Sequence, residues 1–255
     1  MRAVLSVARF SFMRRASGLK LLGPGVVALL PCLMMSVVLF EGDPIEALDL
    51  YRNYMVPATL YFVLPLVCMF VMLPVLSELY DKGAIGYLYT RPAPRWKILL
   101  GMFLGAYAAT IPVFFIGVLA PVMMGLAFAE TSGIHDWIPL GTGIFAILAV
   151  ASLAYGSICI FIGVSTKRPI LWAFFVLVGL GSVMGSVPGS GQQFSLHYYL
   201  ISLAYRWCGI TGSESNLFSP LETIASVPMS LLILVATSAV VMVFTSIAAQ
   251  RRDVL

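Results

Sequence analysis

The sequence predicts an all-α protein that crosses a membrane six times. Of its 255 residues, 60% are hydrophobic and only 10% are charged, whereas an ordinary soluble domain carries about 25% charged residues. A soluble fold of this length exposes too much surface to hide so many apolar side chains. Charged residues also divide the chain into six uncharged stretches of at least 20 residues, the length that a helix needs to cross the hydrocarbon core.

The uncharged stretches place the expected spans. In chain order, these are about residues 21–40, 56–77, 98–120, 140–165, 169–187 and 226–249. Four of the stretches hold 28 to 32 residues, so we expect their helices to tilt or to extend beyond the membrane on one side. Residues 1–255 then form a single transmembrane domain.

Lysine and arginine predict the orientation, because cytoplasmic loops carry the excess of both. Thirteen of the 15 basic residues lie in the N-terminal segment, the second and fourth connections and the C-terminal tail. The opposite face holds only Arg52 and Arg206, with eight of the 11 acidic residues. We therefore expect both termini in the cytoplasm. This sorting by membrane side argues against nucleic-acid binding as the reason for the net charge of +4.

Two further helices are expected outside the spans. Residues 1–20 mix apolar side chains with arginines, which fits a short amphipathic helix on the inner leaflet or a plain positive-inside anchor. The first apolar run is too long for the core of a cleavable signal sequence. Residues 188–225 form an outer loop, in which residues 195–207 have the spacing of an interfacial or re-entrant helix.

The six spans contain no Asp, Glu, Lys, Arg or His. Proton relays and voltage sensors need such groups within the membrane, and no HExxH or Walker A sequence occurs. No cysteine or histidine pair has the spacing of a metal site. His135 and His197 fall in outer connections, where we interpret each as an interfacial polar residue. We expect no cofactor or metal in this chain and no nucleotide hydrolysis without a partner.

The connection between spans 2 and 3 is the most informative segment. Residues 77–107 read SELYDKGAIGYLYTRPAPRWKILLGMFLGAY. Gly83 and Gly86 are expected to break or bend the helix, and a short apolar and aromatic patch lies around them. Pro92 and Pro94 then end one helix and begin the next. By composition alone, this segment fits an ordinary loop with interface anchors as well as a docking surface.

This segment is similar to the signature region of type-2 ABC-transporter permeases, and it most resembles the permeases of nitrous-oxide-reductase maturation systems. The chain departs from the family pattern at Ala84 and Met102. Its tail, residues 250–254, also looks like the usual ending of the family. The matching residues of the segment are Glu78, Lys82, Gly83, Leu88, Thr90, Arg91, Pro92, Arg95, Trp96, Leu99, Leu100 and Gly101.

The resemblance implies a coupling helix between spans 2 and 3 that docks on a separate ATPase subunit, where ATP and Mg are bound. Two ATPase subunits and a second permease copy, identical or homologous, would complete an exporter in a bacterial or archaeal cytoplasmic (inner) membrane. A periplasmic or accessory protein would have to supply any large substrate-binding domain. The aromatic side chains of the segment suit an interface, and its charged side chains can set the register of docking. Glu78 and Arg95 could instead pair within the permease. The expected ATPase contacts are Glu78, Lys82, Gly83, Ile85, Tyr87, Leu88, Arg91, Pro92, Arg95 and Trp96.

Candidate pathway residues are aromatic positions of spans 2 and 5, namely Tyr61, Phe62 and Phe174, although bundle packing would explain them equally well. Gly181 and Gly185 form a small-residue face in span 5, and Gly101 and Gly105 form another in span 3. Such faces let helices approach closely, either within one chain or against a second copy.

Two other functions stay open at this point. The chain could be a membrane scaffold or assembly factor that recruits cytoplasmic proteins and moves no substrate. It could also be an intramembrane enzyme, which the absence of ionisable pairs in the spans disfavours.

Overall fold

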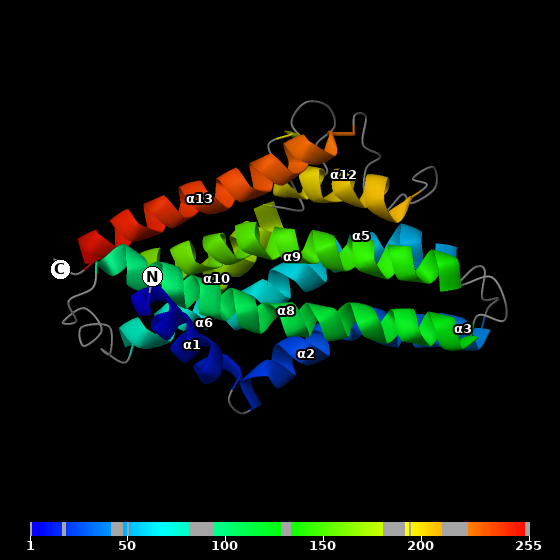
Figure 1. Ribbon diagram of the computed structural model, residues 1–255, viewed down its shortest axis with the longest axis horizontal. Coiled ribbons are helices and arrows are strands. Elements are labelled where there is room, and N and C mark those ends of the chain that lie inside the picture. Colours follow the sequence, from blue (N-terminus) through cyan, green and yellow to red (C-terminus); the bar gives the residue numbers. More distant parts are fainter. Residues whose placement is uncertain are drawn as a thin grey trace.

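The computed structural model describes residues 2–16, 19–41, 48–49, 51–81, 94–128, 134–180, 192–193, 195–210 and 224–252. Within these residues the chain is helical apart from short turns, and it contains no strand. The helices form an elongated bundle, and both chain termini lie near the same end of it (Figure 1). The expected all-α fold is confirmed.

Four helices are long and apolar enough to cross a membrane: Tyr51–Glu78, Trp96–Ala127, His135–Ser165 and Val227–Gln250. They correspond to expected spans 2, 3, 4 and 6. Helices α8 (Arg95–Phe128) and α9 (Ile134–Ser165) contain 34 and 32 residues, so each is about 50 Å long at 1.5 Å per residue. Both exceed the thickness of a hydrocarbon core, as the long uncharged stretches predicted.

The helical stretch of expected span 2 alternates between π-helical and α-helical winding and changes three times. It contains η2 (Tyr51–Met55), α5 (Val56–Ala58), η3 (Thr59–Val63) and α6 (Leu64–Asp81), and both η2 and η3 are π-helical. Helix α6 contacts α2, α8, α9 and α10. It is mostly buried, whereas α13 (Val227–Arg252) lies at the edge of the bundle.

The other two expected spans are shorter in the structure. Apolar helix covers Leu22–Val37 and Pro169–Gly179. The first consists of α2 (Leu22–Ala28) and α3 (Leu30–Glu41), which are separated by a turn at Leu29. Pro31 follows this turn and has no N–H to donate, which weakens the helix there.

Span 5 begins as α10 (Pro169–Phe174) and continues as the π-helical η4 (Phe175–Leu180). Residues 181–191 lie outside the described part of the chain, so Gly181 and Gly185 fall there. Their role in packing two copies stays a prediction.

Two helices join the long ones. Helix α1 (Arg2–Ala16) packs against α8. Helix α12 (Leu196–Cys208) begins after Ser195, whose Oγ accepts a hydrogen bond from His197 N, and ends before Gly209 at φ 62°. Glycine adopts this left-handed conformation without the strain that a β-carbon brings. Helix α12 contacts α5, η3, α9 and α13, and it lies beside α5 in Figure 1.

Candidate functional site

The expected ATPase-docking segment lies between the end of α6 and the start of α8. Residues 82–93 are outside the described residues, and with them Lys82, Gly83, Ile85, Tyr87, Leu88, Arg91 and Pro92. The described residues on either side include Glu78, Arg95 and Trp96. The described part of the site therefore includes the ends of α6 and α8, which lie on either side of this segment.

Helix α1 crosses α8 at the small-residue face of Gly101 and Gly105. A β-carbon at Gly101 would lie 2.8 Å from the Val4 carbonyl oxygen, and one at Gly105 would lie 2.6 Å from Cβ of Ser11 and against the backbone of Ala8. The two helices therefore touch through their backbones. Of the two alternatives for this face, the structure shows packing within one chain.

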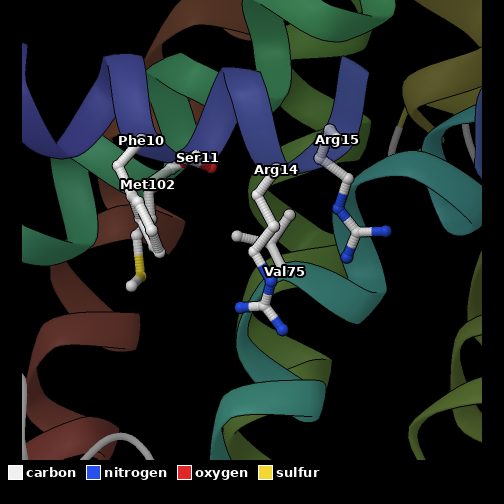
Figure 2. A pocket seen from close by; sticks show the side chains of 6 residues that line it. All are labelled: Phe10, Ser11, Arg14, Arg15, Val75 and Met102. Atoms are coloured by element: carbon white, nitrogen blue, oxygen red, sulfur yellow. The ribbon is translucent and has the colours of Figure 1, made fainter. Parts of the chain in front are cut away.

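A buried hydrogen bond fixes the register of this crossing. Ser11 Oγ donates to the backbone oxygen of Met102 over 3.1 Å. The side chains of Phe10, Ser11, Arg14, Arg15, Val75 and Met102 enclose a cavity of about 10 Å³, enough for about one water molecule. Figure 2 shows Arg14 and Arg15 extending from α1 past Val75 of α6. The space is too small for a substrate, so α1 is closely fitted to the bundle here.

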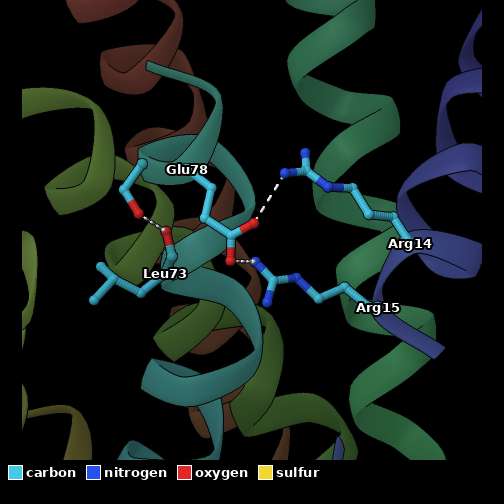
Figure 3. A network of polar contacts seen from close by, with 5 residues as sticks. Arg14, Arg15, Leu73 and Glu78 are labelled. Carbon is cyan, nitrogen blue, oxygen red and sulfur yellow. Dashed lines mark hydrogen bonds and ion pairs between the residues drawn. The ribbon is translucent and has the colours of Figure 1, made fainter. Parts of the chain in front are cut away.

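Both arginines reach the same carboxylate, which lies 64 residues away from Arg14 in the chain. Arg14 Nη2 lies 2.9 Å from Glu78 Oε2, and Arg15 Nη2 lies 3.7 Å from Glu78 Oε1 (Figure 3). The side chain of Arg15 is only 8% exposed, and that of Glu78 is 30% exposed. Burial lowers the pKa of Arg15, and the attraction of Glu78 opposes this shift. The carboxylate therefore compensates a cation that has lost most of its contact with water.

We name the crossing of α1 on α8, together with the ion pairs of Arg14 and Arg15 with Glu78, the α1 brace. It joins α1 to the last turns of α6 and to the second and third turns of α8. These are the two helices that lie on either side of residues 82–93 in the sequence. Glu78 was also expected to contact an ATPase; its pairing within the chain is what the structure shows, and the exposed part of its side chain leaves room for a partner.

Trp96 lies at the start of α8 with an exposed side chain. Nζ of Lys97 lies 5.4 Å from the centre of its ring, a cation–π arrangement. An exposed indole beside a lysine fits both an anchor at the membrane interface and a contact with a partner.

The three candidate pathway residues differ in their exposure. Phe62 and Phe174 are 46% and 52% exposed. Tyr61 is buried, and its ring stacks on His197 of α12 with 4.4 Å between ring centres. Tyr61 therefore faces the interior of its own chain, whereas Phe62 and Phe174 are free to face a second copy, lipid or a substrate.

The interpretation of His197 as an interfacial residue is wrong. The structure buries it at 1% exposure, with its ring against the hydroxyl of Tyr155. A signal for this burial exists in the sequence: His197, Leu200, Ile201, Ala204 and Cys208 recur at helical spacing, and all are buried in α12. The polarity of histidine concealed its place on the apolar face.

The π-helical turns were not predicted. They occur in η2 and η3 of span 2 and in η4 of span 5, the two spans from which the candidate pathway residues come. π-Helical turns are rare and occur frequently at functional sites. Their wider winding has no simple signature in residue type, so only the backbone geometry reveals them.

A second cavity lies between α8 and α9, with a volume of about 310 Å³. Apolar side chains line it together with Thr142, whose hydroxyl donates to backbone oxygens of its own helix at Ile138 and Pro139. The hydroxyl proton of Thr142 is therefore engaged within its own helix, and the other described side chains that line the cavity are apolar.

No model of a known protein family matches the chain, and no curated protein sequence matches it. On its geometry alone, the candidate site consists of the α1 brace and the helix ends on either side of residues 82–93. Within the described residues, no group of three or more His, Cys, Asp or Glu side chains is arranged to hold a metal ion.

Proposed function

We propose that this chain is the membrane-spanning permease subunit of an ATP-driven ABC exporter. It forms the substrate pathway as a dimer and couples to two separate ATPase subunits through residues 78–97. The observation that carries the proposal is the α1 brace. It ties together the two helix ends between which an apolar, ring-rich segment lies, so a force on that segment would move the ends of α6 and α8 as one body.

The position of α6 explains how such a force would spread. Helix α6 is mostly buried and contacts α2, α8, α9 and α10. Packed helices move as rigid elements between a few arrangements. ATP binding by the partner subunits would favour one arrangement of the bundle, and hydrolysis would return it to the other.

Two copies would enclose the pathway in this proposal. The exposed rings of Phe62 and Phe174 and the π-helical turns of spans 2 and 5 support a contact or pathway at these spans. The glycines of span 5 would then pack against the second copy. The two shorter apolar helices would complete six spans, with both termini in the cytoplasm of a bacterial or archaeal inner membrane.

The test is association with an ATPase subunit. The chain is purified with a C-terminal tag from its native membrane, and co-purifying nucleotide-binding subunits are identified by mass spectrometry and by stimulated ATP hydrolysis. We expect Arg91→Glu and Arg95→Glu to reduce the amount of co-purified ATPase at least about tenfold, because reversing a charge at a partner contact costs more than about 1.4 kcal/mol. Membrane insertion should be unchanged.

Arg206→Glu is the matched control, since Arg206 is an exposed arginine of α12 and far in sequence from the docking segment. It should retain full ATPase association. Undiminished association in both the Arg91 and Arg95 variants would contradict the contact assignment. A folded, inserted chain that co-purifies with no ATPase at all would instead favour the scaffold alternative.

A further inference from the structure

A buried histidine joins α12 to η3 and α9. The His197 ring stacks on Tyr61 of η3 at an interplanar angle of 21°, and its Nδ1 lies 2.9 Å from the hydroxyl of Tyr155 in α9. The two rings of Tyr155 and His197 meet edge to face, with 5.6 Å between centres. These contacts hold the first turn of α12 against the long helices.

The other described polar contacts of α12 lead elsewhere. Arg206 Nε donates to the Ala225 carbonyl oxygen over 3.0 Å, and Ala225 N donates to Ser202 Oγ over 3.3 Å. These two bonds tie α12 to Ala225, which lies two residues before the start of α13. These bonds would keep α12 attached to the start of α13 if its apolar face and His197 moved away from η3 and α9.

The surroundings of His197 do not stabilise a positive charge. The titratable groups that face it are Tyr155 from α9 and Tyr61 from η3, and Tyr205 of α12 interacts with Tyr61. Neither α5 nor residues 227–250 of α13 contain an acidic or basic side chain. No described carboxylate acts on the ring, and burial lowers the pKa of His197, in a helix outside the spans, to about 4, although a backbone hydrogen bond to Tyr61 opposes this shift.

We propose that α12 is an acid-released latch, in which neutral His197 holds α12 on Tyr61 and Tyr155 and protonation of the ring frees α12 from η3 and α9. A neutral imidazole accepts a hydrogen bond on one nitrogen and donates from the other. The imidazolium has two donors and no acceptor, and in this site it would be a buried cation with no carboxylate beside it among the described residues. The inference rests on the packing of α12 and not on the proposed transport function.

The direction of the pH effect follows from the two states of the ring. A released ring that reaches water titrates near 6.5, whereas in the closed helix its pKa is about 4. The closed state is therefore fully stabilised above about pH 6.5 and loses stability as the pH falls toward 4. Between pH 7.5 and pH 5, the equilibrium constant for opening should rise about 30-fold.

Cys208 reports on this opening, because it is a free thiol at the C-terminal end of α12 and is buried. The full chain is placed in nanodiscs without any ATPase and treated with a thiol reagent at pH 7.5 and at pH 5. Mass spectrometry gives the labelling rate of each cysteine, and each rate is divided by the rate of the same cysteine in denatured protein at the same pH. We expect this ratio to rise about 30-fold for Cys208 on acidification and to stay constant for Cys68 and Cys159, which are buried in the bundle.

His197→Gln keeps a side chain that donates and accepts but cannot be protonated in this range, and it should abolish the pH response of Cys208. His135→Gln, at an exposed histidine in the first turn of α9, should leave the response intact. Tyr155→Phe removes the hydroxyl that His197 contacts and should raise the normalised labelling rate of Cys208 at pH 7.5. This variant tests the latch independently if His197→Gln does not fold. A response below about threefold in the unchanged protein, a persistent response in His197→Gln, or no change in Tyr155→Phe would each overturn the latch.

Discussion

Replacing Gly105 by leucine will detach α1 from α8. Even the first carbon of the new side chain would lie 2.6 Å from Cβ of Ser11 and against the backbone oxygen of Ala8. Backbone atoms of a packed helix cannot move aside as a flexible side chain can. Overpacking a close contact costs about 1–3 kcal/mol, and a leucine here has no space to occupy unless the whole helix moves.

Limited trypsin digestion measures the detachment. Arg14 and Arg15 lie in α1 and pair with Glu78 when α1 is docked. The peptide bonds that follow these two arginines should therefore resist trypsin. In Gly105→Leu we expect an N-terminal tag to be released at least about tenfold faster, since loss of about 1.4 kcal/mol of docking free energy raises the open population tenfold.

Gly23→Leu is the control for this variant. Gly23 is also a helical glycine of an apolar segment, but a β-carbon there would meet nothing within 4 Å. Its tag should be released at the rate of the unchanged protein. Equal cleavage of the Gly105 and Gly23 variants would show that the backbone contact between α1 and α8 does not hold α1 in place.

Replacing Glu78 by glutamine will lower the stability of the chain by about 1–3 kcal/mol. The substitution keeps the size of the side chain but removes the charge that faces two guanidinium groups. Arg15 is 8% exposed and cannot turn fully into water without moving α1. The cost arises mainly from this buried cation, since the partly exposed pair of Arg14 and Glu78 is worth less.

The apparent melting temperature in detergent checks this expectation. Glu78→Gln should lower it by several degrees, and the double variant Arg15→Gln with Glu78→Gln should recover part of the loss because the buried charge is gone. Asp136→Asn, an exposed acid in the first turn of α9, should change it little. A Glu78 variant as stable as the Asp136 variant, with no recovery in the double variant, would contradict the role of this carboxylate in the α1 brace.

The Gly105 variant also separates stability from coupling. Gly105 belongs to the α1 brace but lies outside residues 78–97, which are expected to contact the ATPase. If the proposed function holds, Gly105→Leu should leave ATPase association largely intact and reduce the stimulation of ATP hydrolysis by the permease. Arg91→Glu and Arg95→Glu should reduce association itself.

The long helices were predictable because their signal is local. An uncharged stretch of 20 or more residues predicts a helix wherever the rest of the chain lies, and all four long helices match such a stretch. The excess length of α8 and α9 was also visible as 32 and 30 uncharged residues. The glycine spacing at 101 and 105 indicated a close helix contact but not which helix would make it.

The partners of individual side chains were not predictable in the same way. Nothing near Glu78 in the sequence indicates that Arg14, 64 residues away, will meet it. Likewise, the apolar spacing around His197 indicates burial, but only the approach of η3 and α9 supplies Tyr61 and Tyr155. The π-helical turns depend on how the backbone is wound at those places, which residue types leave open.

The difference between the predictable helices and the unpredictable side-chain contacts has a physical cause. Partitioning into a bilayer depends on the summed hydrophobicity of consecutive residues, so the amino-acid order alone was enough to predict an all-α chain with long apolar helices. The α1 brace and the His197 contact instead depend on where helices cross, and crossings are set by packing between residues that are distant in the chain. Such contacts exist only once the helices have assembled, and they determine which charges are compensated and which polar groups are buried.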